Sequence, residues 1–149
     1  FIRDHFEVRR LLESEALAGA IRAGINPEAL EDLQRWAEEH KDTMTAEEYR
    51  SYNQRFHMAL WEGCGNKRLK SLLLSLWNGP SAGTAGRDRG HEALSIRVYR
   101  QMLECLRRGD VPGGRAAMEQ HIQRSMENIL RSFSFACAGK ERPVEHPQC

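Results

Sequence analysis

The chain has 149 residues, enough for one domain with a single buried core. Its 22 basic and 21 acidic residues nearly cancel, whereas a domain that binds nucleic acid by itself usually carries a basic excess. No stretch approaches the roughly 20 apolar residues that span a bilayer, and the charged start of the chain is unlike a signal peptide. We therefore expect a cytoplasmic protein with no membrane partner, whose four scattered cysteines stay reduced.

Apolar residues recur three and four positions apart along the chain, which is typical of amphipathic helices, and no alternating pattern indicates a strand. The first predicted helix covers residues 2–23 and ends at Gly24, a residue suited to a left-handed cap. The second begins where Asn26 can cap the helix and Pro27 can occupy its first position, and it ends near His40.

The middle of the chain contains two further predicted helices. Thr45 and Glu48 form a capping box, which opens a helix over residues 46–63. A strongly apolar helix follows over residues 67–77. Residues 78–90 contain four glycines and one proline, and this composition predicts a loop.

The C-terminal third is also predicted to be helical. A fifth helix covers about residues 91–108 and ends at Gly109. Asp110 caps a sixth helix over about residues 111–135, although two successive glycines weaken its first turn. The polar, proline-containing segment 139–149 is expected to be a disordered tail.

Amphipathic helices with mostly short connections imply an all-α, antiparallel bundle of about six to seven helices, formed by residues 1–138. A di-iron enzyme built on such a bundle needs a Glu three residues before a His on two helices. Gln54 and Met118 stand at that distance before His57 and His121. The zinc-protease, phosphate-loop and nucleophile-elbow motifs are missing too, so we expect no enzymatic activity.

Three phrases are spread over most of the chain. They are Phe6-Glu7-Val8-Arg9-Arg10-Leu11-Leu12-Glu13, then Phe56-His57 followed by Asn66-x-x-Leu69, and then Leu106-Arg107-Arg108-Gly109-Asp110 followed by Ala116-Ala117-Met118 and His121-Ile122. In this order and spacing they resemble the FCD domains found in FadR-like members of the GntR family of bacterial transcription regulators.

The resemblance implies a helical bundle that binds a small molecule, often an organic or sugar acid, and that forms a homodimer. In the family such a domain follows a winged helix-turn-helix domain that binds operator DNA. That domain is not part of this sequence, so contact with DNA is expected only through a domain outside it. The alternative is a domain that has lost effector and metal binding and serves dimerisation only.

The resemblance also implies a divalent metal such as zinc or nickel, held by an Asp and a His four residues apart and by two later histidines. His57 and His121 match two of these ligands, but Asn53 and Tyr99 stand in place of the other two. An amide carries no charge, and a phenol with a pKa of about 10 is neutral near pH 7, so the metal site is expected to be weakened. These side chains can instead hydrogen-bond the effector directly or hold a water. As a metal ligand, His91 is the alternative donor that the sequence offers.

The resemblance assigns Arg9 to the effector carboxylate, which a planar guanidinium can bind through two parallel hydrogen bonds. Without the resemblance, a surface arginine is the simpler interpretation. Four aromatic residues are expected to pack in the core: Tyr52, Phe56, Trp61 and Trp77. The predicted effector site therefore consists of Arg9, Asn53, His57, Tyr99 and His121.

Overall fold

The computed structural model describes residues 1–77 and 87–138, with side chains up to Ser134. The described residues form six helices and no strand, which confirms the predicted all-α bundle. The helices are α1 (Ile2–Ala23), α2 (Glu28–His40), α3 (Ala46–Gly63), α4 (Lys67–Trp77), α5 (Arg89–Arg108) and α6 (Val111–Ala138). None of the described helices is both long and apolar enough to cross a bilayer.

The predicted caps at Gly24 and Thr45 lie at the observed helix ends, whereas α2 begins one residue later than predicted, with Pro27 at its N-cap position and the Asn26 side chain accepting a hydrogen bond from the Glu28 backbone. Gly24 adopts the left-handed conformation with φ 62°, and Thr45 and Glu48 form both hydrogen bonds of the capping box. The α5 helix begins two residues earlier than predicted because the Asp88 side chain accepts a hydrogen bond from the His91 backbone and caps it there. The α6 helix continues to residue 138. The predicted loop over 78–86 and the predicted tail over 139–149 lie outside the described residues.

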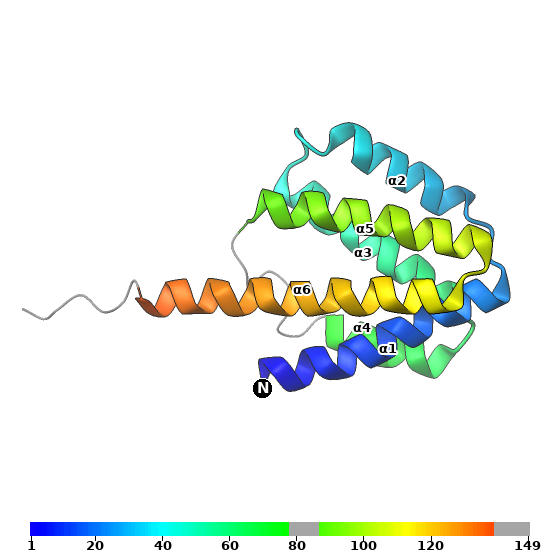
Figure 1. Cartoon of the computed structure of the whole chain (residues 1–149), viewed down its shortest axis with the longest axis horizontal. Helices are drawn as coiled ribbons and strands as arrows, with labels where there is room; N and C mark the ends of the chain where they lie inside the picture. The colour runs from blue at the N-terminus through cyan, green and yellow to red at the C-terminus, as the bar shows by residue number, and fades with distance from the viewer. Residues whose placement is uncertain (78–86, 139–149) are drawn as a thin grey trace, which may run out of the picture.

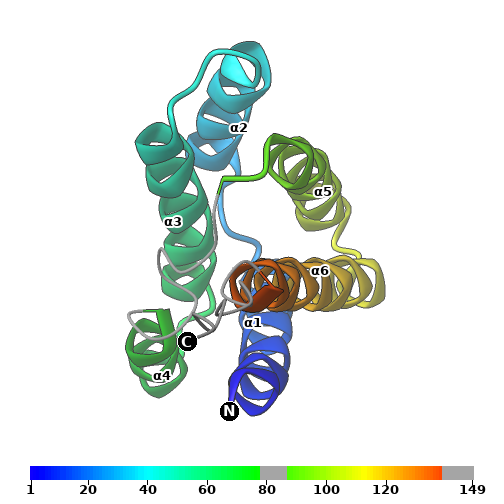
Figure 2. The same ribbon diagram turned by 90° about the vertical axis from the view of Figure 1, so that its left-hand side faces the viewer.

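Helices α1 and α6 form the centre of the bundle. Figure 1 shows them running antiparallel, with α5 on the other side of α6 and α2 beyond α5. Figure 2 views the bundle end on, with α3 and α4 on the side of the bundle away from α5. The α3 helix packs against α1, α2 and α4, and α6 packs against α1 and α5. Buried apolar side chains from α1, α3, α5 and α6 form one core.

The two glycines in the first turn of α6 have separate structural roles. A Cβ atom on Gly114 would lie 2.6 Å from Ile21 Cδ1 and 3.4 Å from Leu17 Cδ2, so glycine allows α6 to approach α1 closely. Gly113 donates its backbone N–H to the capping carboxylate of Asp110 at 2.9 Å. A Cβ at Gly113 would collide with that carboxylate. The cap and the close packing therefore offset the low helix propensity of this turn.

Candidate functional site

The hydroxyl group of Tyr99, on α5, connects three helices in the core. It lies 2.7 Å from Nε2 of His57 on α3 and 3.0 Å from Nε2 of His121 on α6, and it donates a hydrogen bond to the Asn53 side-chain oxygen. The side chains of Tyr99 and His57 are fully buried, and His121 is only 3% exposed. We call these four residues the Tyr99 cluster.

The helices fix the geometry of the Tyr99 cluster. Asn53 and His57 lie one turn apart on α3, so their side chains project from the same face. The Phe56 ring stacks on the Tyr99 ring with centroids 4.4 Å apart and planes 7° apart, which orients the phenol toward that face. The His121 ring meets the Tyr99 ring edge to face at 4.8 Å. The predicted residues of this cluster therefore do converge.

A buried carboxylate lies behind the Tyr99 cluster. Glu13 on α1 accepts hydrogen bonds from Nδ1 of His57 at 3.0 Å and from Nε1 of Trp61 at 2.9 Å. Its side chain has no exposed surface. The carboxylate therefore joins α1 to α3 and holds the His57 ring in the orientation that meets Tyr99.

Arg9 lies one turn before Glu13 on α1 and is 5% exposed. Its Nε atom is 3.5 Å from a Glu13 carboxylate oxygen, and its guanidinium carbon lies 4.8 Å from the centre of the Trp77 ring. The Nε atom makes no hydrogen bond, and none of the hydrogen bonds between described residues uses the two terminal nitrogens. Arg9 is thus a buried, partly neutralised cation, held by an ion pair and an aromatic face.

Sequence reasoning missed part of this site. Glu13 belongs to the first family-like phrase, but an isolated glutamate on an amphipathic helix is normally read as exposed. Its spacing of four residues from Arg9 was the available signal. The prediction of core packing was right for Tyr52, Phe56 and Trp61, although Trp61 also serves as a hydrogen-bond donor. Trp77 is only partly buried and stacks on Arg9, so the prediction that it packs only in the core was incomplete.

The electrostatics of the site follow from burial and from close charges. Burial raises the pKa of the Glu13 carboxyl, but His57, Arg9 and Trp61 together outweigh this effect, and the pKa lies below its ordinary value. Burial, followed by the nearby His57 and Arg9, lowers the pKa of His121 well below 6.5. Burial also raises the pKa of Tyr99. Near pH 7 the site therefore contains a carboxylate, a guanidinium, a neutral phenol and a neutral His121.

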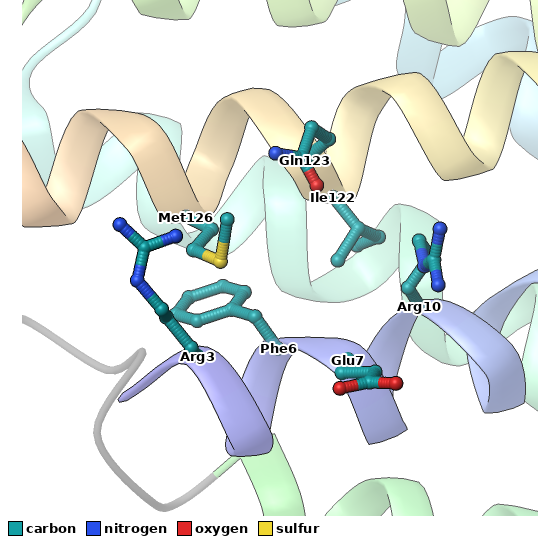
Figure 3. A pocket seen from close by; sticks show the side chains of 7 residues that line it. All are labelled: Arg3, Phe6, Glu7, Arg10, Ile122, Gln123 and Met126. Atoms are coloured by element: carbon teal, nitrogen blue, oxygen red, sulfur yellow. The ribbon is translucent and has the colours of Figure 1, made fainter. Parts of the chain in front are cut away.

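Two grooves on the surface do not involve the Tyr99 cluster. One, of about 300 Å³, lies between α1 and α6 and includes Arg3, Arg10 and Met126 in its walls (Figure 3). The other, of about 560 Å³, lies between α2 and α3 and is bordered by Trp36 and Arg55. Neither groove contacts Arg9 or brings several buried polar groups together. Among the described residues, the best candidate site is therefore the region of the core that contains Arg9, Glu13 and the Tyr99 cluster.

These features define an all-helical domain with a buried polar cluster between four helices. The FCD domain family matches residues 4–124, and the chain belongs to this family. The metal-free FCD domain of TM0439, a proposed transcriptional regulator, has the same fold with a TM-score of 0.76 and 18% sequence identity. That match covers 91% of this chain and 95% of the other. No curated protein matches the sequence significantly.

The residues present do not fit the divalent metal that the family resemblance implies. Nε2 of His57 and Nε2 of His121 both face the Tyr99 hydroxyl, so its oxygen lies where an ion shared by the two imidazoles would have to sit. The Asn53 oxygen is uncharged, and the raised pKa of Tyr99 keeps the phenol protonated. Within residues 1–77 and 87–134, no group of three His, Cys, Asp or Glu side chains is placed to hold an ion, and His91 does not complete one.

We expect acid to destabilise the domain through His121. Its lowered pKa means that, below about pH 6.5, the unfolded chain binds a proton that the folded chain does not bind. The free energy of unfolding should therefore fall by up to about 1.4 kcal/mol per pH unit between pH 6.5 and the lower folded pKa. Urea denaturation from neutral pH to about pH 5 measures this slope. His121→Gln should flatten the slope, whereas the same change at the exposed His40 should not. A slope that is equal in the wild type and His121→Gln contradicts this prediction.

Proposed function

We propose that the chain is the effector-sensing and dimerisation domain of a bacterial transcription regulator of the GntR family, FadR subfamily. It binds a small organic or sugar acid inside the bundle, between Arg9 and the Tyr99 cluster. The effector then modulates operator binding by a winged helix-turn-helix domain attached to this one. The chain works as a binding domain and not as an enzyme.

The observation that carries the proposal is the state of Arg9. A charged side chain that is 5% exposed normally has its donors satisfied. Glu13 approaches the Nε edge of the guanidinium, which leaves the two terminal nitrogens for another acceptor. A carboxylate can accept two parallel hydrogen bonds from these two terminal nitrogens. The charge of Arg9 is thus well placed for an acidic ligand in a site lined by Trp77 and His57.

The connections of the site suggest how binding is transmitted. The Tyr99 cluster joins α3, α5 and α6, and Glu13 extends it to α1. An effector that binds one packing of these helices better than another shifts the population toward it. Exposed apolar side chains on the neighbouring helices α1 and α4 offer a surface for a second copy, namely Val8, Leu11 and Leu72. A change in helix packing would then alter the spacing of two attached DNA-binding domains.

Arg9→Ala tests the assigned site. We expect carboxylates to raise the melting temperature of the wild-type chain, since a ligand at a hundred times its dissociation constant contributes about 2.7 kcal/mol. That contribution corresponds to roughly 5–10 °C. Arg9→Ala should abolish this response while the chain still folds, and Arg9→Lys should restore it only partly because the planar fork is lost. Thermal denaturation with a panel of carboxylates, without metal and with zinc or nickel, provides the measurement.

Arg10→Ala is the matched control, because this neighbouring arginine lines the outer groove instead of the core (Figure 3). Its response to carboxylates should equal that of the wild type. An unchanged response in Arg9→Ala would remove Arg9 from the site. If no carboxylate stabilises the wild type, with or without metal, the chain serves dimerisation only.

A further inference from the structure

Four basic side chains have buried nitrogen atoms without a hydrogen-bond partner. These atoms are His5 Nε2 and Arg9 Nε on α1, and His121 Nδ1 and Arg124 Nη2 on α6. A buried polar atom without a partner is destabilising, so a ligand that supplies the partner would be favoured at such a position. Arg9 Nε faces the Glu13 carboxylate at 3.5 Å, and the ring nitrogen of a neutral histidine can accept as well as donate, so the guanidinium of Arg124 is the group that most needs an anionic partner.

The helix geometry places these groups at the same level of the bundle. His5 and Arg9 lie one turn apart on α1, and His121 and Arg124 lie three residues apart on α6. The helices run antiparallel, with Gly114 against Leu17 and Ile21 at one end of their contact. At the other end, Phe6 faces Ile122 and Met126, as Figure 3 shows. This register brings Arg9 level with His121 and Arg124.

The two arginines differ in how far their charges are balanced. Arg9 forms an ion pair with Glu13, whereas no ion pair of Arg124 occurs among the described side chains. Arg124 lies three residues after His121 on α6, and Arg9 lies at the same level on the neighbouring helix α1. Two cationic groups therefore approach the same histidine from different helices.

We propose that the effector is a dicarboxylate, with one acidic group bound by Arg9 of α1 and the other by Arg124 of α6. This inference rests on the proposed function, because it concerns the same site. A ligand with a single carboxylate satisfies one guanidinium and leaves the buried Nη2 atom of Arg124 without a partner. A second carboxylate provides that partner and links α1 to α6, the two helices at the centre of the bundle.

Calorimetric titration of the 149-residue chain, freed of metal, tests the proposal. The probes are malonate, succinate, glutarate and adipate, each compared with the straight-chain monoacid of the same carbon number. At least one diacid should bind about tenfold or more tightly than its monoacid, since a hydrogen bond to a charged group contributes that much. Arg124→Ala should reduce the affinity for this diacid to that for the monoacid, and leave the monoacid unchanged. Arg97 is exposed on α5, so Arg97→Ala is the control and should alter neither the affinity for the diacid nor that for the monoacid.

Three outcomes contradict the proposal, and they can be told apart. If monoacids bind as tightly as diacids and depend on Arg9, the proposed function stands but the effector needs only one acidic group. If Arg124→Ala weakens both classes equally, Arg124 supports the site in general and does not bind a second carboxylate. If no acid of either class binds the wild type, the proposed function fails together with this inference.

Discussion

Replacing Glu13 by alanine is expected to destabilise the domain by about 3–5 kcal/mol, the usual cost of breaking a buried ion pair from one side. The carboxylate accepts hydrogen bonds from His57 and Trp61 and balances the charge of Arg9. Its removal leaves two buried donor groups without an acceptor and the charge of Arg9 without its ion-pair partner. Urea denaturation should show the loss directly, and the melting temperature should fall by about 10 °C or more. Glu13→Gln, which keeps one acceptor oxygen, should cost less.

Glu15→Ala is the matched control for this effect. Glu15 lies on the same helix and also has two basic partners, Arg22 at 3.2 Å and Arg115 at 2.7 Å. Its side chain is 50% exposed, however, and solvent screens such pairs to about 0–1 kcal/mol. Equal losses in Glu13→Ala and Glu15→Ala would show that the buried network around His57 contributes no more than surface ion pairs.

The second large effect is the gain of a metal site. The Asn53→Asp/Tyr99→His double variant combines two new donors with His57 and His121, and it removes the hydroxyl that lies between the two imidazoles. Zinc or nickel in hundredfold excess over the dissociation constant should then stabilise the variant by about 2.7 kcal/mol. The same ions should leave the wild type unchanged. Thermal denaturation with and without a chelator measures both responses.

Tyr99→Phe separates the loss of the hydroxyl from the gain of a donor. This variant keeps the ring that stacks on Phe56 but provides no ligand, so it should not respond to metal. Metal binding by the wild type as tight as that of the double variant would contradict the conclusion that the natural residues do not fit an ion. A double variant without any response would show that the four positions do not converge on one point.

Local sequence signals were sufficient to predict most of the fold. Capping depends on one side chain and the backbone within three residues, so Gly24, Thr45 and Asp110 could be recognised from the sequence alone. The start of α5 was placed too late because Asp88 caps a turn that contains Gly90, which reads as part of the preceding loop. The close approach of α6 to Ile21 depends on the tertiary packing, and for that reason Gly114 was first read only as a weak helix former.

The site was predictable only as far as the family resemblance extends. It gave Arg9, Asn53, His57, Tyr99 and His121, and the structure brings these residues into one region of the core. Burial of a charged residue depends on which helix faces cover it, and a sequence pattern does not report this. The spacing of four residues is compatible with an ion pair between Arg9 and Glu13, but the burial of Glu13 and of the Arg124 Nη2 atom could be recognised only from the packed bundle.

The measurement that tests the central claim most directly is a high-resolution crystal structure of this chain grown with the most stabilising carboxylate, with anomalous scattering recorded for zinc and nickel. We predict that the carboxylate binds the terminal nitrogens of Arg9. We also predict that the Tyr99 oxygen lies between His57 and His121, with no anomalous peak between the two imidazoles. An ion between the two imidazoles would contradict the metal-free account of the site. An acid bound only in the outer groove beside Arg10 would contradict the assignment of the effector site itself.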